Sequence, residues 1–112
     1  MANNFKNYSI KAVGTTAQNA YSIAQGSATQ ATVIGMTISN AFNSPIDASV
    51  SLSGGSHTGN VWLIKNATIA PGGSLVPIGG DQKLVIESGD YLAVNTSIAS
   101  SADVIVSVLE IS

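Results

Sequence analysis

Apolar and polar residues alternate along this chain in short runs, the pattern typical of β-strands with one buried face. The clearest run is Ala48–Ser53, where Ala48, Val50 and Leu52 alternate with serines. Glycine-rich turns separate such runs, and no stretch has the length and apolar period of an amphipathic helix. The pattern therefore predicts an all-β protein with antiparallel strands.

Turn residues mark the ends of the predicted strands. Pro71-Gly72 suits the two central positions of a type II turn, because glycine supplies the positive φ that the third residue needs. We predict strands at Tyr8–Val13, Ala20–Ala24, Ala31–Phe42, Ala48–Ser53, Val61–Lys65, Leu84–Glu87, Tyr91–Val94 and Asp103–Ile111. About eight or nine short strands at this spacing indicate an antiparallel β-sandwich, and they leave jelly-roll and Ig-like topologies open.

The length of the chain predicts one domain. Its 112 residues can bury one core and leave little room for a second. Residues 1–7 precede the first alternating run and are predicted to form an N-terminal arm. Residues 8–112 are predicted to form a single β-sandwich domain.

One predicted strand contains an internal glycine. In Ala31–Phe42, Ile34, Met36 and Ile38 share one face, and Gly35 lies on the other. A glycine inside a strand is compatible with a bulge or with a close approach of another backbone. The face that contains Gly35 is small and semi-polar, so we expect it to be solvated or closely packed.

The last predicted strand is apolar on both faces. Its Ile105 and Leu109 alternate with Val104, Val106 and Val108. A strand of this kind normally lies in the middle of a sheet and is covered on both sides. We therefore expect the C-terminal strand to be central and covered.

Charged residues are scarce. Asp, Glu, Lys and Arg make up 9% of the chain, against roughly 25% in ordinary globular domains. The chain has no arginine and a formal net charge of −2, so we predict no binding to nucleic acid, whose affinity is largely electrostatic. The low charge fits either a neutral, serine-rich β surface or a surface buried between subunits, because interface cores are depleted of charged residues.

The sequence also limits where the protein can work. It contains no cysteine, which excludes disulfides and thiolate metal sites and fits a reducing cytosol or a particle assembled there. No segment approaches the roughly 20 apolar residues of a membrane-spanning helix. The first residues lack the hydrophobic region of a signal peptide. We expect no membrane partner.

No set of residues predicts catalysis. His57 is the only histidine, and it lies between Ser56 and Thr58 without a local carboxylate to orient its ring. Asp81 and Asp90 lie in turns, where a carboxylate accepts hydrogen bonds from backbone amides. A glycosidase would need converging carboxylates in a cleft lined by aromatic side chains, and this chain has few of them. We predict a protein that is not an enzyme and binds no cofactor or metal.

The C-terminal half carries a recognisable series of strand and turn residues. In order, the segments are 61–73 (VWLIKNATIAPGG), 80–87 (GDQKLVIE), 88–94 (SGDYLAV) and 99–111 (ASSADVIVSVLEI). This series resembles the C-terminal part of small virion structural proteins of tailed bacteriophages. The resemblance covers about half the chain, residues 61–112, and concerns strand and turn residues rather than active-site residues.

The resemblance implies a small β-sandwich subunit that is repeated with symmetry on a phage particle. Its place would be the capsid surface, as a decoration or cement protein, or the neck, tail or baseplate. Its partners would be further copies of itself and other virion proteins, such as the major capsid, portal, neck or tail proteins. It would be located in the virion, after assembly in the cytoplasm of the host bacterium.

Another function remains open, a carbohydrate- or receptor-binding β-sandwich module of the tail or baseplate. Trp62 fits the anchor of a core or an interface, and it also fits a stacking platform for a sugar ring, as Tyr91 does. The candidate contact residues for either function are Phe5, Tyr8, His57, Trp62 and Tyr91. Phe5 belongs to the predicted arm, and His57 belongs to the loop at residues 54–59.

Overall fold

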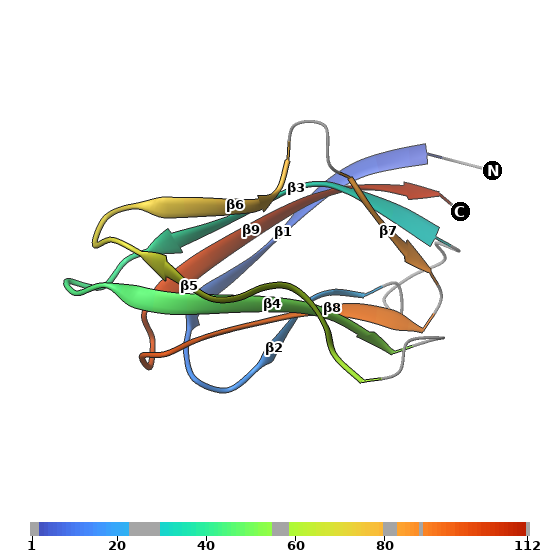
Figure 1. Ribbon diagram of the computed structural model, residues 1–112. Helices are drawn as coiled ribbons and strands as arrows, with labels where there is room; N and C mark the ends of the chain where they lie inside the picture. Colours follow the sequence, from blue (N-terminus) through green and yellow to red (C-terminus); the bar gives the residue numbers. More distant parts are fainter. Residues whose placement is uncertain (1–2, 23–29, 55–58, 80–82, 88, 112) are drawn as a thin grey trace.

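The computed structural model describes residues 3–22, 30–54, 59–79, 83–87 and 89–111. These residues form nine β-strands in two antiparallel sheets that pack face to face (Figure 1). The strands are β1 (Asn3–Val13), β2 (Gln18–Ser22), β3 (Gln30–Asn40), β4 (Ile46–Gly54), β5 (Val61–Ile69), β6 (Ser74–Ile78), β7 (Leu84–Glu87), β8 (Asp90–Thr96) and β9 (Ala102–Ile111). The predicted antiparallel β-sandwich is confirmed. The described residues include no helix that could span a membrane.

Strands that are distant in sequence lie side by side in both sheets. Sheet A has the order β1-β9-β3-β6, and β7 also pairs with β3. β7 pairs with the first half of β3 and β6 with the second half, so the two short strands share one edge of the sheet. Sheet B has the order β2-β8-β4-β5. The chain therefore passes repeatedly from one sheet to the other, which ties the two layers together.

The core lies between the two sheets and is aliphatic. Alternation along β4 directs Ala48, Val50 and Leu52 inward, as the sequence predicts. The bulkiest fully buried side chains come from both layers: Met36, Ile38, Ile46, Ile78, Ile86 and Leu92. Burial of such side chains contributes roughly 1.5–3 kcal/mol each, which makes this layer the main source of stability.

A bulge reverses the inward face of β3 partway along the strand. Val33 and Met36 are both buried, although strict alternation would place them on opposite faces. The register with β9 shifts between Val33 and Gly35, at the glycine whose position the sequence marks as compatible with a bulge. The prediction that Ile34 shares a face with Met36 and Ile38 is therefore wrong, because one extra residue at the bulge offsets the alternation.

β9 lies at the centre of sheet A, between β1 and β3. Its inward residues Val104, Val106 and Val108 are fully buried. Its outward Ile105 is 55% exposed, so the expectation that both faces are covered is wrong within this chain. A two-layer sandwich has no third layer to cover the outer face of a sheet.

The segment predicted as an N-terminal arm is part of an edge strand. Residues 3–7 form the first half of β1 and pair with β9 from Ser107 to Ile111. Strand β9 supplies the backbone hydrogen-bond partners of these residues, and the sequence alone does not reveal that pairing. The polar run at the N-terminus therefore extends sheet A along its full length.

Strand β6 is absent from the predicted strands. It contains Pro77, and proline within a short apolar run argues against a strand in the sequence. Proline cannot donate to a ladder and is confined to edges, and β6 is an edge strand. The turn before β6 has the predicted type II form. Gly72 has a φ of 73°, and the Gly73 amide donates to the Ala70 carbonyl oxygen at 2.9 Å.

The packing of sheet B predicts different costs for two valine substitutions. Val50→Ala, at a side chain with no exposed surface, should lower the free energy of unfolding by about 2 kcal/mol, because it removes buried atoms and leaves a cavity. Val61→Ala on the neighbouring β5 is the matched control, since that side chain is 50% exposed. Urea denaturation measures both. Equal losses would contradict this assignment of the core.

Candidate functional site

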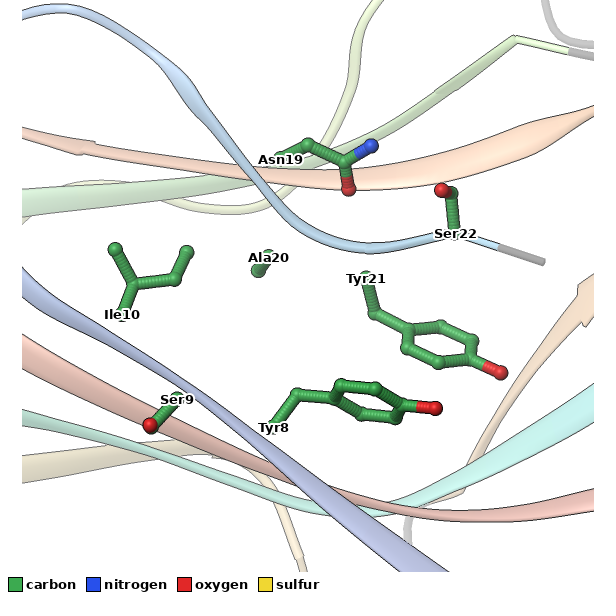
Figure 2. Close-up of a pocket in the computed structure, with 7 residues that line it drawn as sticks. All are labelled: Tyr8, Ser9, Ile10, Asn19, Ala20, Tyr21 and Ser22. Carbon is green, nitrogen blue, oxygen red and sulfur yellow. The ribbon is translucent and has the colours of Figure 1, made fainter. Parts of the chain in front are cut away.

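One candidate site lies between β1 of sheet A and β2 of sheet B, at the open side of the sandwich. A pocket of about 180 Å³ is lined there by Tyr8, Ser9, Ile10, Asn19, Ala20, Tyr21 and Ser22 (Figure 2). The rings of Tyr8 and Tyr21 lie one above the other, with centroids 5.2 Å apart and planes tilted by 51°. Figure 2 shows that both hydroxyl groups point in the same direction.

Both tyrosine hydroxyl groups donate to the carboxylate of Glu110. The distances to Oε2 are 2.8 Å from Tyr8 and 2.6 Å from Tyr21. Lys6 Nζ lies 3.9 Å from Oε1 of the same carboxylate. Glu110 continues the inward face of β9 after Val108, so its carboxylate sits at the end of the apolar layer between the sheets.

The surroundings of this cluster favour the ionised form of Glu110 and the neutral forms of Tyr8 and Tyr21. The hydrogen bond from Tyr21 is the main cause that lowers the pKa of Glu110, with smaller contributions from Tyr8 and Lys6. Burial is the main cause that raises the pKa of Tyr8 and of Tyr21, and the hydrogen bonds to Glu110 raise both further. The carboxylate is therefore ionised and the tyrosines are neutral at physiological pH.

This arrangement suits a structural lock better than a reaction. The donors and the acceptor are engaged with one another, and neither tyrosine is poised to act as a base. Tyr21 comes from sheet B, while Glu110 and Tyr8 come from sheet A. The cluster therefore connects the two sheets at one end of the sandwich by charge-assisted hydrogen bonds.

A second candidate site is the outer face of sheet B. Trp62 and Tyr91 are 41% and 40% exposed there, and they flank the strand that carries Ser51 and Ser53. Lys65 Nζ lies 4.1 Å from the centroid of the Trp62 ring, a cation–π contact that covers one face of the indole. Of the two interpretations of Trp62, the structure does not support a place in the core.

The serines of β4 face outward, as their alternation predicts, but they are buried by neighbouring side chains. Ser49 Oγ accepts a hydrogen bond from the Asn66 amide at 2.9 Å, and Ser53 Oγ donates to Asn60 Oδ1. Asn66 has a φ of 54°, in the left-handed region that asparagine tolerates better than most residues. The hydroxyl groups of Ser49 and Ser53 therefore already have hydrogen-bond partners within the chain.

The third candidate site is the outer face of sheet A, which carries the most exposed aromatic side chain. Phe5 is 76% exposed on β1 and pairs in register with Leu109 of β9. Ile105 is exposed on the same face, and Val76 and Val85 are exposed at the edge formed by β6 and β7. These apolar side chains lie outside the core.

The structure distributes the predicted contact residues over separate surfaces. Phe5 lies on the outer face of sheet A, Tyr8 lies in the cluster with Glu110, and Trp62 and Tyr91 lie together on the outer face of sheet B. His57 falls outside the described residues. Asp81 does as well, while Asp90 accepts a hydrogen bond from the Glu87 amide at 3.1 Å, as predicted for a turn aspartate.

Sequence reasoning missed Tyr21 and Glu110 as partners of Tyr8. Glu110 has the same parity as the buried valines of β9, and that signal could have placed it on the inward face. Tyr21 is 89 residues away from it in sequence, and only the packing of the sheets brings the two together. Among the described residues, no group of His, Cys, Asp and Glu is arranged to hold a metal ion.

At the level of sequence, no family model and no curated protein matches this chain. Two solved structures share its fold. One is a chain of Bacillus endospore appendages, a family of disulfide-linked pili, with 12% identity and a TM-score of 0.56 over 99% of this chain and 88% of that one. Another is a chain of the acid-stable capsid of Helicobacter pylori bacteriophage KHP30, with 13% identity and a TM-score of 0.55 over 99% and 89%. These likenesses show the β-sandwich fold.

The lowered pKa of Glu110 predicts how stability depends on pH. A carboxylate of this kind contributes stability that is complete above its ordinary pKa, near 4.5, and is lost as the pH falls through the lower value in the folded protein. The free energy of unfolding should therefore decrease as the pH falls below about 4.5. Glu110→Gln should flatten this decrease, measured by urea denaturation at a series of pH values.

Asp103 provides the control for this experiment. The Ala12 amide is the main cause that lowers the pKa of this carboxyl group, so Asp103→Asn removes a different part of the acid dependence. Asp103 is on the exposed side of β9 and its contribution is screened by solvent, so its effect should be the smaller. A Glu110→Gln variant with the same pH dependence as the unmodified protein would contradict the proposed lock.

Proposed function

We propose that this chain is a non-enzymatic structural protein of a bacteriophage virion that assembles symmetrically on the particle. A capsid decoration or cement protein, or a neck component, fits best. The resemblance of residues 61–112 to small virion proteins supports this function. The fold likeness to a chain of a phage capsid and a chain of a pilus agrees with it, since both of those structures are polymeric.

The order of the strands supports the same proposal. If β6 and β7 count as one position, each sheet has four positions, and their neighbours are mostly non-consecutive in the chain. We infer that this is a jelly roll, the double-sheet topology built from two Greek keys rather than the Ig-like alternative. Jelly rolls are frequent among viral capsid domains.

The outer face of sheet A is the observation that carries the proposal. It exposes Phe5, Ile105 and Val85 on a chain whose charged residues make up only 9%. Exposed apolar patches of this kind mark protein interaction sites. The partners would be further copies of this chain and other virion proteins, and the site of action would be the virion, assembled in the host cytoplasm. No cofactor, membrane or nucleic acid is part of this function.

The copy number of the chain in purified virions tests the proposal. Quantitative mass spectrometry of particles of the source phage should find this chain in a fixed ratio to the major capsid protein. A ratio near one indicates a decoration or cement protein. A much smaller copy number, equal to the subunits of a few rings, indicates the neck, tail or baseplate. Absence of the chain from the particles would contradict the virion function.

Trp62 and Tyr91 support a second candidate function, a carbohydrate- or receptor-binding module. Both side chains are partly exposed on the same face, and sugar rings stack on aromatic side chains of this kind. On this hypothesis a glycan array should show binding that Trp62→Ala abolishes and Phe42→Ala, at another exposed aromatic residue, does not. Absence of any bound glycan would remove this candidate, and the contact of Lys65 with the indole already limits access to it.

A further inference from the structure

The outer face of sheet A consists of rows that run across the strands. One row is formed by Phe5, Leu109, Thr32 and Val85, which are Cα partners on β1, β9, β3 and β7. A second row contains Ser9, Ile105 and Thr37. Between them, Ile34 beside the bulge lines a shallow depression together with Phe5, Lys6, Asn7, Ser107 and Val108. None of the residues named in these rows is charged.

The two central strands of this face place bulky side chains of β9 beside small side chains of β3 at two levels. Ile105 and Leu109 of β9 are bulky, and their partners on β3 are Thr37 and Thr32. At the level of the bulge, the register partner of Ser107 is Gly35, and the bulky Ile34 next to Gly35 lines the depression together with Ser107. At these three levels the face therefore has one bulky side chain next to a small one.

We propose that a second copy of this chain covers this face, packed through sheet A about a two-fold axis. An axis that lies in the contact plane, parallel to the strands and between β3 and β9, places β9 of each copy over β3 of the other. Ile105 and Leu109 of one copy then meet Thr37 and Thr32 of its partner. The same operation places Phe5 of each copy over Val85 of the other. Such a self-complementary contact is what an isologous dimer requires.

The size of the face is sufficient for this contact. Sheet A has four strand positions, and β9 has ten residues. At about 4.8 Å per strand and 3.3 Å per residue, the face measures roughly 600 Å². Two copies would bury roughly 1,200 Å² in all, which reaches the lower end of the range for specific interfaces.

Charge favours a second copy over a charged partner. Lys11 at one end of the face is paired with Asp103 at 3.4 Å, so this end presents no strong field to a partner. The net charge of −2 makes repulsion between two copies small. Glu87, exposed on β7, is at the other end of the face. The occupant that matches the bulky and small uncharged side chains between these ends is the same face of another copy.

This inference deepens the proposed function, because it names the surface and the partner of an assembling subunit. It also accounts for the two-faced apolar pattern of β9. The core covers the valines on one side, and the second copy covers Ile105 and Leu109 on the other. Only in the dimer does sheet A have a sheet packed on each of its two faces.

Cysteine cross-linking tests the geometry, and the chain offers a clean background because it contains no cysteine. Phe5 and Val85 lie three strand spacings apart within one copy, roughly 14 Å, which is too far for a disulfide. The double variant Phe5→Cys with Val85→Cys should therefore form only disulfides between copies. On mild oxidation it should give covalent dimers, and each single variant should stay monomeric on non-reducing gels. A double variant that does not cross-link, or single variants that cross-link equally well, would overturn the proposal.

Charge substitution gives a second, independent readout by analytical ultracentrifugation. Ile105→Lys should weaken the dimer by about 100-fold or more, because it buries an unpaired ammonium group. Val61→Lys is the control, since it adds the same charge at a similarly exposed valine of sheet B and should leave the dimer intact. A mixture of Ile105→Lys and Thr37→Asp copies should restore dimers, because the proposed axis opposes these two positions. Equal effects of both lysine variants, or no restoration in the mixture, would contradict the axis.

These results separate the two proposals. A chain that stays monomeric and uncross-linked but is present in purified virions would overturn the two-fold contact and leave the virion function standing. A chain that dimerises as described but is absent from virions would overturn the virion function and leave the contact standing. Both outcomes follow from measurements on the full chain.

Discussion

A two-layer sandwich can bury only one face of each of its sheets, and the surface properties of this protein follow from that constraint. The inward faces are filled by aliphatic side chains, so the outward faces are available for contacts with other molecules. In sheet B the outward serines make contacts within the chain, such as that of Ser49 with Asn66, and Trp62 and Tyr91 are partly exposed. In sheet A the outward face remains apolar and exposed at Phe5 and Ile105. The two sheets therefore differ in what their outer faces can do.

The polar cluster at the open side shows how the apolar layer ends. Glu110 occupies an inward position of β9, where desolvation would make an isolated carboxylate costly. Two tyrosine hydroxyl groups offset that cost, one from each sheet. Lys6 compensates part of the charge from the side of β1. The buried side of the Glu110 carboxylate is therefore hydrogen-bonded, and these hydrogen bonds connect the two sheets.

Other connections between strands use backbone groups and buried side chains. At the opposite end of the sandwich, Asn40 Nδ2 donates to the carbonyl oxygens of Ser44 and Ile69 at 2.9 and 3.0 Å. Thr96 Oγ1 and Ser101 Oγ are within 2.8 Å of one another. Because buried polar groups without partners are costly, these contacts fix how the turns close on the core. The apolar layer is therefore sealed by polar contacts at both ends.

The sequence predicted those parts of the fold that depend on local alternation and turn chemistry. The alternation in β4 and the type II turn at Pro71-Gly72 need no knowledge of distant residues. Strand β6 was missed because Pro77 is tolerated only at an edge, and an edge is a property of the assembled sheet. The reversal of faces in β3 was missed because alternation identifies Gly35 as a candidate bulge but does not show that the register shifts there.

The candidate sites depended more on tertiary structure than the strands did. The sequence could not pair Tyr8 with Tyr21, because the contact requires the edge of sheet A to lie against the edge of sheet B. It also could not decide whether Trp62 lies in the core, since aromatic residues are common both there and at interfaces. The apolar residues on both faces of β9 were visible in the sequence, and they led to the prediction that both faces are buried. Within a single chain only the inward face is buried.

That excess of apolar surface is the strongest argument for assembly. An exposed isoleucine such as Ile105 favours the strand conformation, but a polar β-branched residue there would do so with a lower risk of aggregation. Charged residues at other exposed positions of the same sheet, such as Lys11, show that the face tolerates them at its end. On this face Ile105 and Leu109 lie on the central strand β9, and Phe5 and Val85 lie on the two edge strands in the same row as Leu109. The exposed apolar side chains therefore extend across the whole width of sheet A, and exposed apolar patches are typical of protein interaction sites.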